Sequence, residues 1–233
     1  MATDGNMTRH VQLLVALVAT ELIRPLMARA DSVARIVSVT FFILVGVAVF
    51  RAIFDTQRLR QIGAALGGTV IAIGFAGILD PSPPRVPMEV LMNASTAAFF
   101  VFVLSVIVGH VFGARRLAMD DVVGAFSGYI VIALIWGRLY AIAWTVVPNY
   151  FSVSPDIKWQ LDNWNTLHAL FDFYSFATIT SIGYGDITTT GPVTNNLVWL
   201  EVMCGQFYLA VVVATIVGIK MSQALDSSSR DGA

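Results

Sequence analysis

The sequence predicts an all-α membrane protein of six transmembrane helices, with five helices as the alternative. Of its 233 residues, 57% are hydrophobic and only 12% are charged, which is about half the charged fraction of an ordinary soluble domain. The hydrophobic residues also form runs that are long enough to cross a bilayer. The net charge is −1, so there is no basic field to attract nucleic acid, and the lipid bilayer is the expected surrounding.

The segment 11–28 is the first candidate helix, and it leaves the number of spans open. Its length is near the lower limit of about 17 residues for spanning, and Glu21 and Arg24 interrupt it at a helical spacing that lets them neutralise each other. The alternatives are an interfacial helix and a signal peptide ending at Ala30. The signal peptide is disfavoured, because two charged residues and Pro25 separate the apolar run from the cleavage site. Residues 1–10 are expected to be a cytoplasmic N-terminus.

Five further apolar runs predict the remaining spans, at 36–54, 62–79, 90–112, 121–147 and 196–221. Orientation follows from arginines near the ends of these runs, since cytoplasmic loops carry an excess of Arg and Lys. These are Arg51, Arg58, Arg60, Arg115 and Arg116. With the first span included, both termini are cytoplasmic, and the expected location is a multi-pass protein of the cell (plasma or inner) membrane.

A short apolar helix is predicted at 163–181, and a glycine-rich segment follows it. The segment reads Thr180-Ser181-Ile182-Gly183-Tyr184-Gly185-Asp186. Two glycines around a tyrosine permit backbone conformations that turn successive carbonyl groups toward one axis. A ring of such oxygens can replace the hydration shell of K⁺. The alternative interpretation is an ordinary glycine-rich turn between two helices.

This segment resembles the selectivity filter of the potassium channel superfamily, whose usual form is Thr-Val-Gly-Tyr-Gly. The resemblance is specific over 178–186 and extends over 121–221 as an outer helix, pore helix, filter and inner helix. Over 1–120 it is general, to prokaryotic six-span channels with a single pore loop and no arginine voltage sensor. It implies K⁺ sites formed by Ser181, Ile182, Gly183 and Tyr184, with Gly185 at the outer mouth.

The resemblance also implies the residues that support the filter. Thr180 leads into the filter, and Asp186 is expected to brace it from behind, against Tyr174. Serine and isoleucine replace the usual threonine and valine, which leaves the strictness of K⁺ selectivity open. Gly205 falls at the family's inner-helix hinge, although close helix packing through a small residue is an equal alternative.

One filter segment forms one wall of a pore, so four copies of the chain are expected to assemble into a homotetramer. The predicted domains are a four-helix transmembrane region at 11–118, a pore domain at 119–222 and a short cytoplasmic tail at 223–233. No cofactor is expected besides the permeant K⁺. A gate is expected either in the membrane part of this chain or in an unidentified regulatory subunit.

Three charged residues lie within apolar stretches, where an unpaired charge costs at least a few kcal/mol. They are Arg138, Asp172 and Glu201. The helical depths predict an Arg138–Glu201 pair with Asp172 between them, holding three helices in register. Gating through protonation of Glu201 is the rarer alternative.

These features predict a K⁺-selective channel that conducts passively and has little or no voltage dependence, because 90–112 contains no charged residue. The alternatives are a weakly selective cation channel and a K⁺ uptake subunit. An enzyme is disfavoured, because His10, His110 and His168 are scattered and the sequence contains no recognisable catalytic or metal-ligand spacing.

Overall fold

The computed structural model describes residues 7–26, 57–79, 86–113, 119–161 and 164–231. The protein is predominantly helical. Its long helices are α1 (Met7–Leu26), α3 (Gln57–Leu79), α4 (Val86–Gly113), α5 (Met119–Val146) and α7 (Pro192–Asp231), and the shorter α6 is Trp164–Ile179. The predicted span 36–54 lies outside the described residues.

Three of these helices are long and apolar enough to cross a membrane, at Val86–Val111, Asp120–Val146 and Pro192–Gln223. They coincide with the runs predicted at 90–112, 121–147 and 196–221, which confirms a helical membrane protein. The predicted run 62–79 is helical within α3. The apolar part of α1, His10–Ala19, is shorter than a span. The total of six spans therefore stays a prediction.

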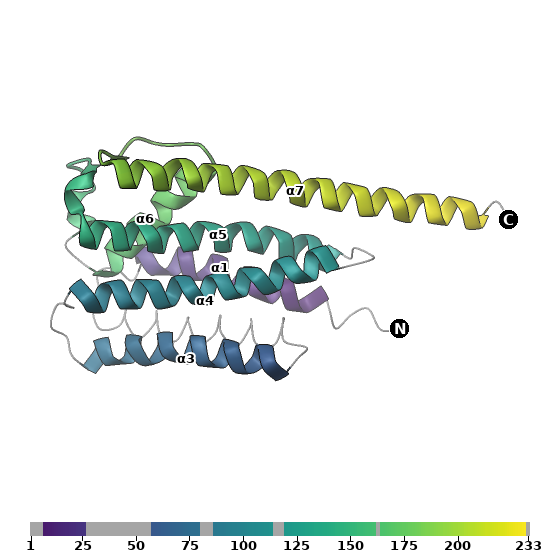
Figure 1. Ribbon diagram of the computed structural model, residues 1–233, viewed down its shortest axis with the longest axis horizontal. Coiled ribbons are helices and arrows are strands. Elements are labelled where there is room, and N and C mark those ends of the chain that lie inside the picture. The colour runs from purple at the N-terminus through teal and green to yellow at the C-terminus, as the bar shows by residue number, and fades with distance from the viewer. Residues whose placement is uncertain (1–6, 27–56, 80–85, 114–118, 162–163, 232–233) are drawn as a thin grey trace.

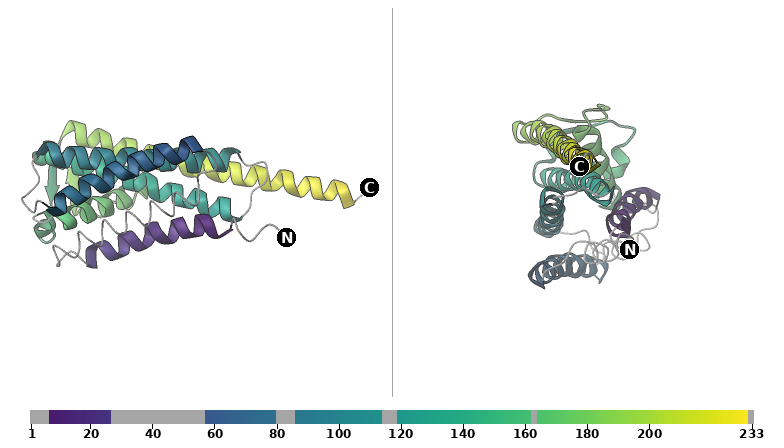
Figure 2. Two further views of the ribbon diagram at one scale, coloured as in Figure 1. Left: turned by 90° about the horizontal axis from the view of Figure 1, so that it is seen from below. Right: turned by 90° about the vertical axis from the view of Figure 1, so that its right-hand side faces the viewer.

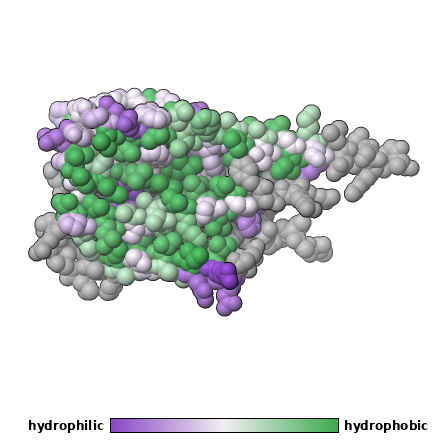
Figure 3. Space-filling view, viewed as in Figure 1, coloured by the Kyte–Doolittle hydropathy of each residue, from purple (hydrophilic) through white to green (hydrophobic). Residues whose placement is uncertain are grey.

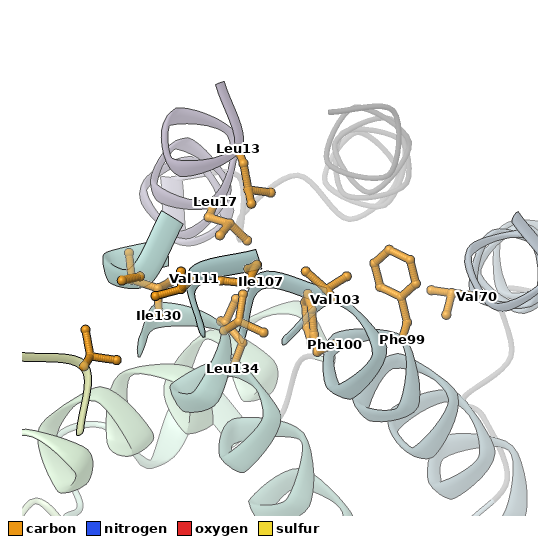
Figure 4. Packing of buried hydrophobic residues seen from close by; sticks show 13 residues of the cluster. Leu13, Leu17, Val70, Phe99, Phe100, Val103, Ile107, Val111, Ile130 and Leu134 are labelled. Carbon is orange, nitrogen blue, oxygen red and sulfur yellow. The ribbon is translucent and has the colours of Figure 1, made fainter. Parts of the chain in front are cut away.

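The helix α5 is the centre of the bundle. Helices α4 and α1 pack against α5 from different sides, and α3 packs against the side of α4 that faces away from α5 (Figures 1 and 2). Helices α6 and α7 also pack against α5. One hydrophobic core joins α1, α3, α4, α5 and α7, with Leu13, Val103 and Leu134 among its buried members (Figure 4). The visible outer face of the bundle is also largely hydrophobic (Figure 3), as expected of a surface that contacts lipid.

Two short strands, β1 (Phe151–Val153) and β2 (Ile187–Thr189), were not predicted. They pair antiparallel, with Ser152 opposite Thr188. Strand β1 follows the end of α5, and β2 follows the glycine-rich segment. Because the two strands pair, the part of the chain that contains α6 begins and ends beside the C-terminal end of α5. Two short 3-10 helices, η1 (Pro148–Tyr150) and η2 (Lys158–Leu161), complete this connection.

Most of the predicted tail at 223–233 is helical in the structure. Helix α7 continues without a break to Asp231 and extends past the rest of the bundle (Figures 1 and 2). The run Ser227-Ser228-Ser229 does not end the helix, although serine has a modest helix propensity. Residues 222–231 are therefore an extension of α7.

Candidate functional site

The glycine-rich segment 180–186 begins where α6 ends. The carbonyl oxygen of Ala177 accepts hydrogen bonds from the backbone N–H groups of Ile182, at 2.9 Å, and Gly183, at 3.2 Å. The N–H of Ser181 donates to the carbonyl of Thr178 at 2.8 Å. These bonds satisfy carbonyl groups that a helix C-terminus leaves without partners.

The same bonds fix the direction of two successive carbonyl groups. In a trans peptide the C=O points opposite to the N–H of the next residue, and the described residues contain no cis peptide bond. Since the N–H groups of Ile182 and Gly183 point at Ala177, the carbonyls of Ser181 and Ile182 both point away from α6. In a regular strand, neighbouring carbonyls would point to opposite sides.

Backbone angles explain how this departure from a strand is possible. The φ angle is positive at Ser181 (59°), Gly183 (56°) and Gly185 (78°), and these are the described residues with positive φ. The intervening Ile182 and Tyr184 therefore have negative φ. This alternation turns neighbouring peptide groups toward one side, and glycine adopts the left-handed conformation without a Cβ penalty. At position 181 the same conformation carries a modest cost, because serine has a Cβ.

The side chains of the segment are largely exposed in the single chain. The ring of Tyr184 stacks on Phe173 of α6, with centroids 5.6 Å apart and an interplanar angle of 14°. Residues 181–185 are all exposed, and Ile182 and Tyr184 have 58% and 64% of their surface accessible. The described part of one chain therefore leaves this segment open to a neighbour.

The structure shows hydrogen bonds of the predicted support residues at both ends of the segment. The hydroxyl of Thr180 donates to the carbonyl of Phe176 at 2.6 Å, so this side chain is bound to the last turn of α6. One carboxylate oxygen of Asp186 accepts the N–H of Ile187 at 3.0 Å. No hydrogen bond joins Asp186 to Tyr174 in the described residues. The Tyr174 ring instead packs edge-on against Tyr140, 4.8 Å between centroids.

Strand β1 holds the far end of the segment, which sequence reasoning missed. The N–H of Ser154, just after β1, donates to the carbonyl of Asp186 at 2.8 Å. Phe151 anchors the strand in an aromatic cluster with Tyr140 and Phe171. The alternation Phe151-Ser152-Val153 was the available signal, but three residues are too few to identify a strand.

The predicted Arg138–Glu201 pair is wrong. Arg138 forms its ion pair with Asp172, and both side chains are buried. Arg138 also donates to the carbonyl of His168 at 3.4 Å. The reason is the closeness of α5 and α6: a Cβ on Gly137 would lie 2.3 Å from Asp172 Oδ1. Only glycine permits this approach, and it places the Asp172 carboxylate directly beside Arg138.

Glu201 has other partners, although it is fully buried. Its Oε2 accepts a hydrogen bond from the Tyr140 hydroxyl at 2.6 Å, and its Oε1 is hydrogen-bonded to the Ser175 hydroxyl. Tyr140 lies on α5 and Ser175 on α6, so Glu201 joins three helices. The predicted set of charged residues is therefore divided into one ion pair and one hydrogen-bonded carboxyl group.

The residues of α7 that face the bundle form one narrow stripe. Its members include Thr194, Glu201, Gly205, Tyr208 and Val212, at spacings that keep them on one side of a helix. Helix α7 is regular through Gly205, and a Cβ there would lie 2.4 Å from Ile179 Cγ1. Close packing, the alternative to a hinge, is therefore observed at Gly205, whereas hinge motion stays a prediction.

Most of α7 outside this stripe is exposed and apolar. Exposed side chains on it include Trp199, Met203, Phe207, Val213 and Val217. Of its apolar window only 11% is buried, against 61% for α5. A helix of this kind needs lipid or another protein chain around it.

Comparison with known proteins gives one short similarity. Over 44 residues the chain is 46% identical to the inward rectifier potassium channel Kirbac3.1 of Paramagnetospirillum magnetotacticum. The matched stretch covers 19% of this chain and 15% of that protein. No family model matches the chain, and no solved structure matches it. The similarity indicates a relationship to potassium channels over a fragment of the chain.

Proposed function

We propose that this chain is one subunit of a K⁺-selective channel, in which four copies surround a pore lined by residues 181–185. The observation that carries the proposal is the pair of successive carbonyl groups, at Ser181 and Ile182, that face away from α6 on an exposed segment. Stacked rings of such oxygens replace the water around K⁺. The short similarity to an inward rectifier potassium channel supports the same class.

Four copies are proposed because one segment provides one set of oxygens and an ion needs them on all sides. The exposed apolar surface of α7 supports this assembly, since neighbouring copies would cover part of it. In this arrangement α6 is the pore helix, α7 lines the inner pore, and residues 119–222 form the pore domain. The helices before residue 119 surround it, with both termini cytoplasmic.

Conduction through such a filter is passive and involves no covalent step. Thr180 and Asp186 hold the two ends of the filter, through the α6 carbonyls and the Ile187 N–H. The Arg138–Asp172 pair fixes the outer helix α5 to α6. None of these residues needs to change chemically while an ion passes.

The decisive experiment is a planar bilayer recording of the purified protein under opposed K⁺ and Na⁺ gradients. We expect single-channel currents that reverse close to the K⁺ equilibrium potential. Mass measurement of the detergent complex should give four chains. Reversal near the Cl⁻ potential, turnover at carrier rates, or a monomeric active species would reject the proposal.

A weakly selective cation channel is the second candidate. The observation that favours it is the filter entry, where Ser181 and Ile182 replace the usual threonine and valine. The same recording separates the two, since a weakly selective pore reverses midway between the K⁺ and Na⁺ potentials. Ser181→Thr and Ile182→Val, alone and combined, then measure how much each residue contributes to the permeability ratio.

A further inference from the structure

The hydrogen bonds of Ser175 allow the proton of a neighbouring carboxyl group to be located. The Ser175 hydroxyl oxygen lies 2.6 Å from the carbonyl oxygen of Ala133 and is also hydrogen-bonded to Glu201 Oε1. A carbonyl oxygen can only accept, and a serine hydroxyl has a single proton to donate. If Ser175 donates to Ala133, the proton between Ser175 and Glu201 must belong to Glu201.

We propose that Glu201 is a protonated, uncharged carboxylic acid that donates to Ser175 and accepts from Tyr140, and that this proton holds α7 against α5 and α6. The chain of donors is then complete: Tyr140 donates to Glu201, Glu201 to Ser175, and Ser175 to Ala133. Each proton has one acceptor, and each partner is buried. If Glu201 were ionised, the single Ser175 proton could be donated either to the Ala133 carbonyl or to Glu201 Oε1. The other of these two contacts would then bring two oxygen atoms together with no proton between them.

The surrounding charges agree with a neutral group. The titratable side chains that interact with Glu201 are Tyr129 and Tyr140 on α5 and Tyr174 on α6. Arg138 and Asp172, on the same two helices, pair with each other. The tyrosines are neutral hydroxyls, and the guanidinium of Arg138 is held by Asp172. Within the described residues no cation pairs with Glu201, and an ionised carboxylate at this depth is costly.

The position of Glu201 links it to the candidate filter, which is residues 181–185. Ser175 lies two residues before Ala177, whose carbonyl holds the N–H groups of Ile182 and Gly183. One turn further along α7, Gly205 packs on Ile179, the last residue of α6. Glu201 is therefore a positioning residue. Its effect on the filter rests on the proposed function, whereas its protonation does not.

Infrared difference spectroscopy on the purified protein tests the protonation directly. The spectrum of the wild-type protein at neutral pH, minus that of Glu201→Gln, should contain the C=O stretching band of a carboxylic acid. Glutamine can donate from its amide N–H₂ to Ser175 and accept from Tyr140, so this variant should assemble. Finding only carboxylate bands in the difference spectrum would overturn the proposal, and it would do so whether or not the protein conducts.

A second variant covers the case in which Glu201→Gln does not fold. Ser175→Ala removes the acceptor of the proposed proton, so the carboxylic acid band should move to higher frequency.

Thermal stability in detergent gives a readout of a different kind. A group that is protonated when folded loses its stabilising effect as pH rises, so the wild type should melt earlier at alkaline pH than at neutral pH, and Glu201→Gln should lack this part of the decrease. An unshifted band together with equal pH profiles for both proteins would contradict the proposal.

Discussion

The carbonyl oxygen of Ala177 and the backbone N–H of Ile182 are 2.9 Å apart, and this hydrogen bond ties the candidate filter to the end of α6. It turns the Ser181 carbonyl away from the helix. The second bond to the same oxygen, from Gly183, turns the Ile182 carbonyl the same way. The geometry of the two oxygens thus depends on backbone groups and on positive φ angles at alternate residues.

Replacing Gly183 by alanine should abolish K⁺ flux. Gly183 has a φ of +56°, and a Cβ there would meet no atom within 4 Å of this chain, so the effect within one chain comes from conformation. A left-handed alanine costs about 1–2 kcal/mol, which is enough to favour a different peptide orientation. The measurement is K⁺ efflux from proteoliposomes. Gly109→Ala, at a helical glycine with equally open space, is the control and should leave efflux intact; equal efflux from both variants would contradict the filter geometry.

Arg138→Met should destabilise the protein by about 3–5 kcal/mol, because it leaves the Asp172 carboxylate buried without its partner. The double variant Arg138→Met/Asp172→Asn should recover part of this loss. The measurement is a double-mutant cycle of thermal or denaturant stability in detergent. The coupling free energy between Arg138 and Asp172 should exceed that between Arg138 and Glu201. The second value comes from a matching cycle with Arg138→Met and Glu201→Gln. The opposite order would restore the pairing that the sequence favoured.

Gly205→Ala should lower the melting temperature through steric overlap with Ile179 and cost about 1–3 kcal/mol. The added Cβ would lie 2.4 Å from Ile179 Cγ1. Ile179→Ala removes that atom, so the double variant should be less destabilised than the sum of the single ones. Gly218→Ala on the same helix has nothing within 4 Å and serves as the matched control. A Gly205→Ala protein that melts like the wild type but opens differently would instead support a hinge.

Ser154→Pro should lower the K⁺ over Na⁺ permeability ratio, because proline lacks the N–H that donates to the Asp186 carbonyl. Loss of one such hydrogen bond costs about 0.5–1.5 kcal/mol. Because Asp186 follows Gly185, the structural change should be greatest at the outer mouth of the proposed filter. Ser154→Ala keeps the N–H and is the control. Reversal potentials in bilayers provide the measurement, and equal ratios for the proline and alanine variants would show that β1 does not support the filter.

Removing K⁺ should lower the thermal stability of the assembled protein. Ions bound only in the assembled state stabilise it by about 2.7 kcal/mol at a concentration 100-fold above Kd. Melting of the detergent complex in K⁺ and in Na⁺ of equal ionic strength measures this effect. Gly183→Ala should show a smaller difference between the two ions. Identical melting of the wild type in both salts would mean that no K⁺ site of useful affinity is present.

Helix positions could largely be predicted, because membrane helices depend on the length and continuity of apolar runs. The predicted 90–112, 121–147 and 163–181 lie within a few residues of α4, α5 and α6. The extension of α7 to Asp231 was missed because its last residues are polar and carry no apolar periodicity. The strands β1 and β2 were missed because each is three residues long and depends on a partner that is distant in the chain, as the pairing of Phe151 with Thr189 shows.

Composition and local glycine chemistry were enough to predict a charge-poor helical membrane protein with 180–186 as its distinctive segment, because these features act without distant contacts. Which buried groups meet depends on how the folded helices pack. Arg138 lies beside Asp172 because Gly137 lets α5 and α6 approach, and Glu201 meets Tyr140 and Ser175 because one stripe of α7 faces both helices. Helical depth sets how far a side chain lies along a helix, whereas its partner depends on how closely two helices pack and on which faces they present.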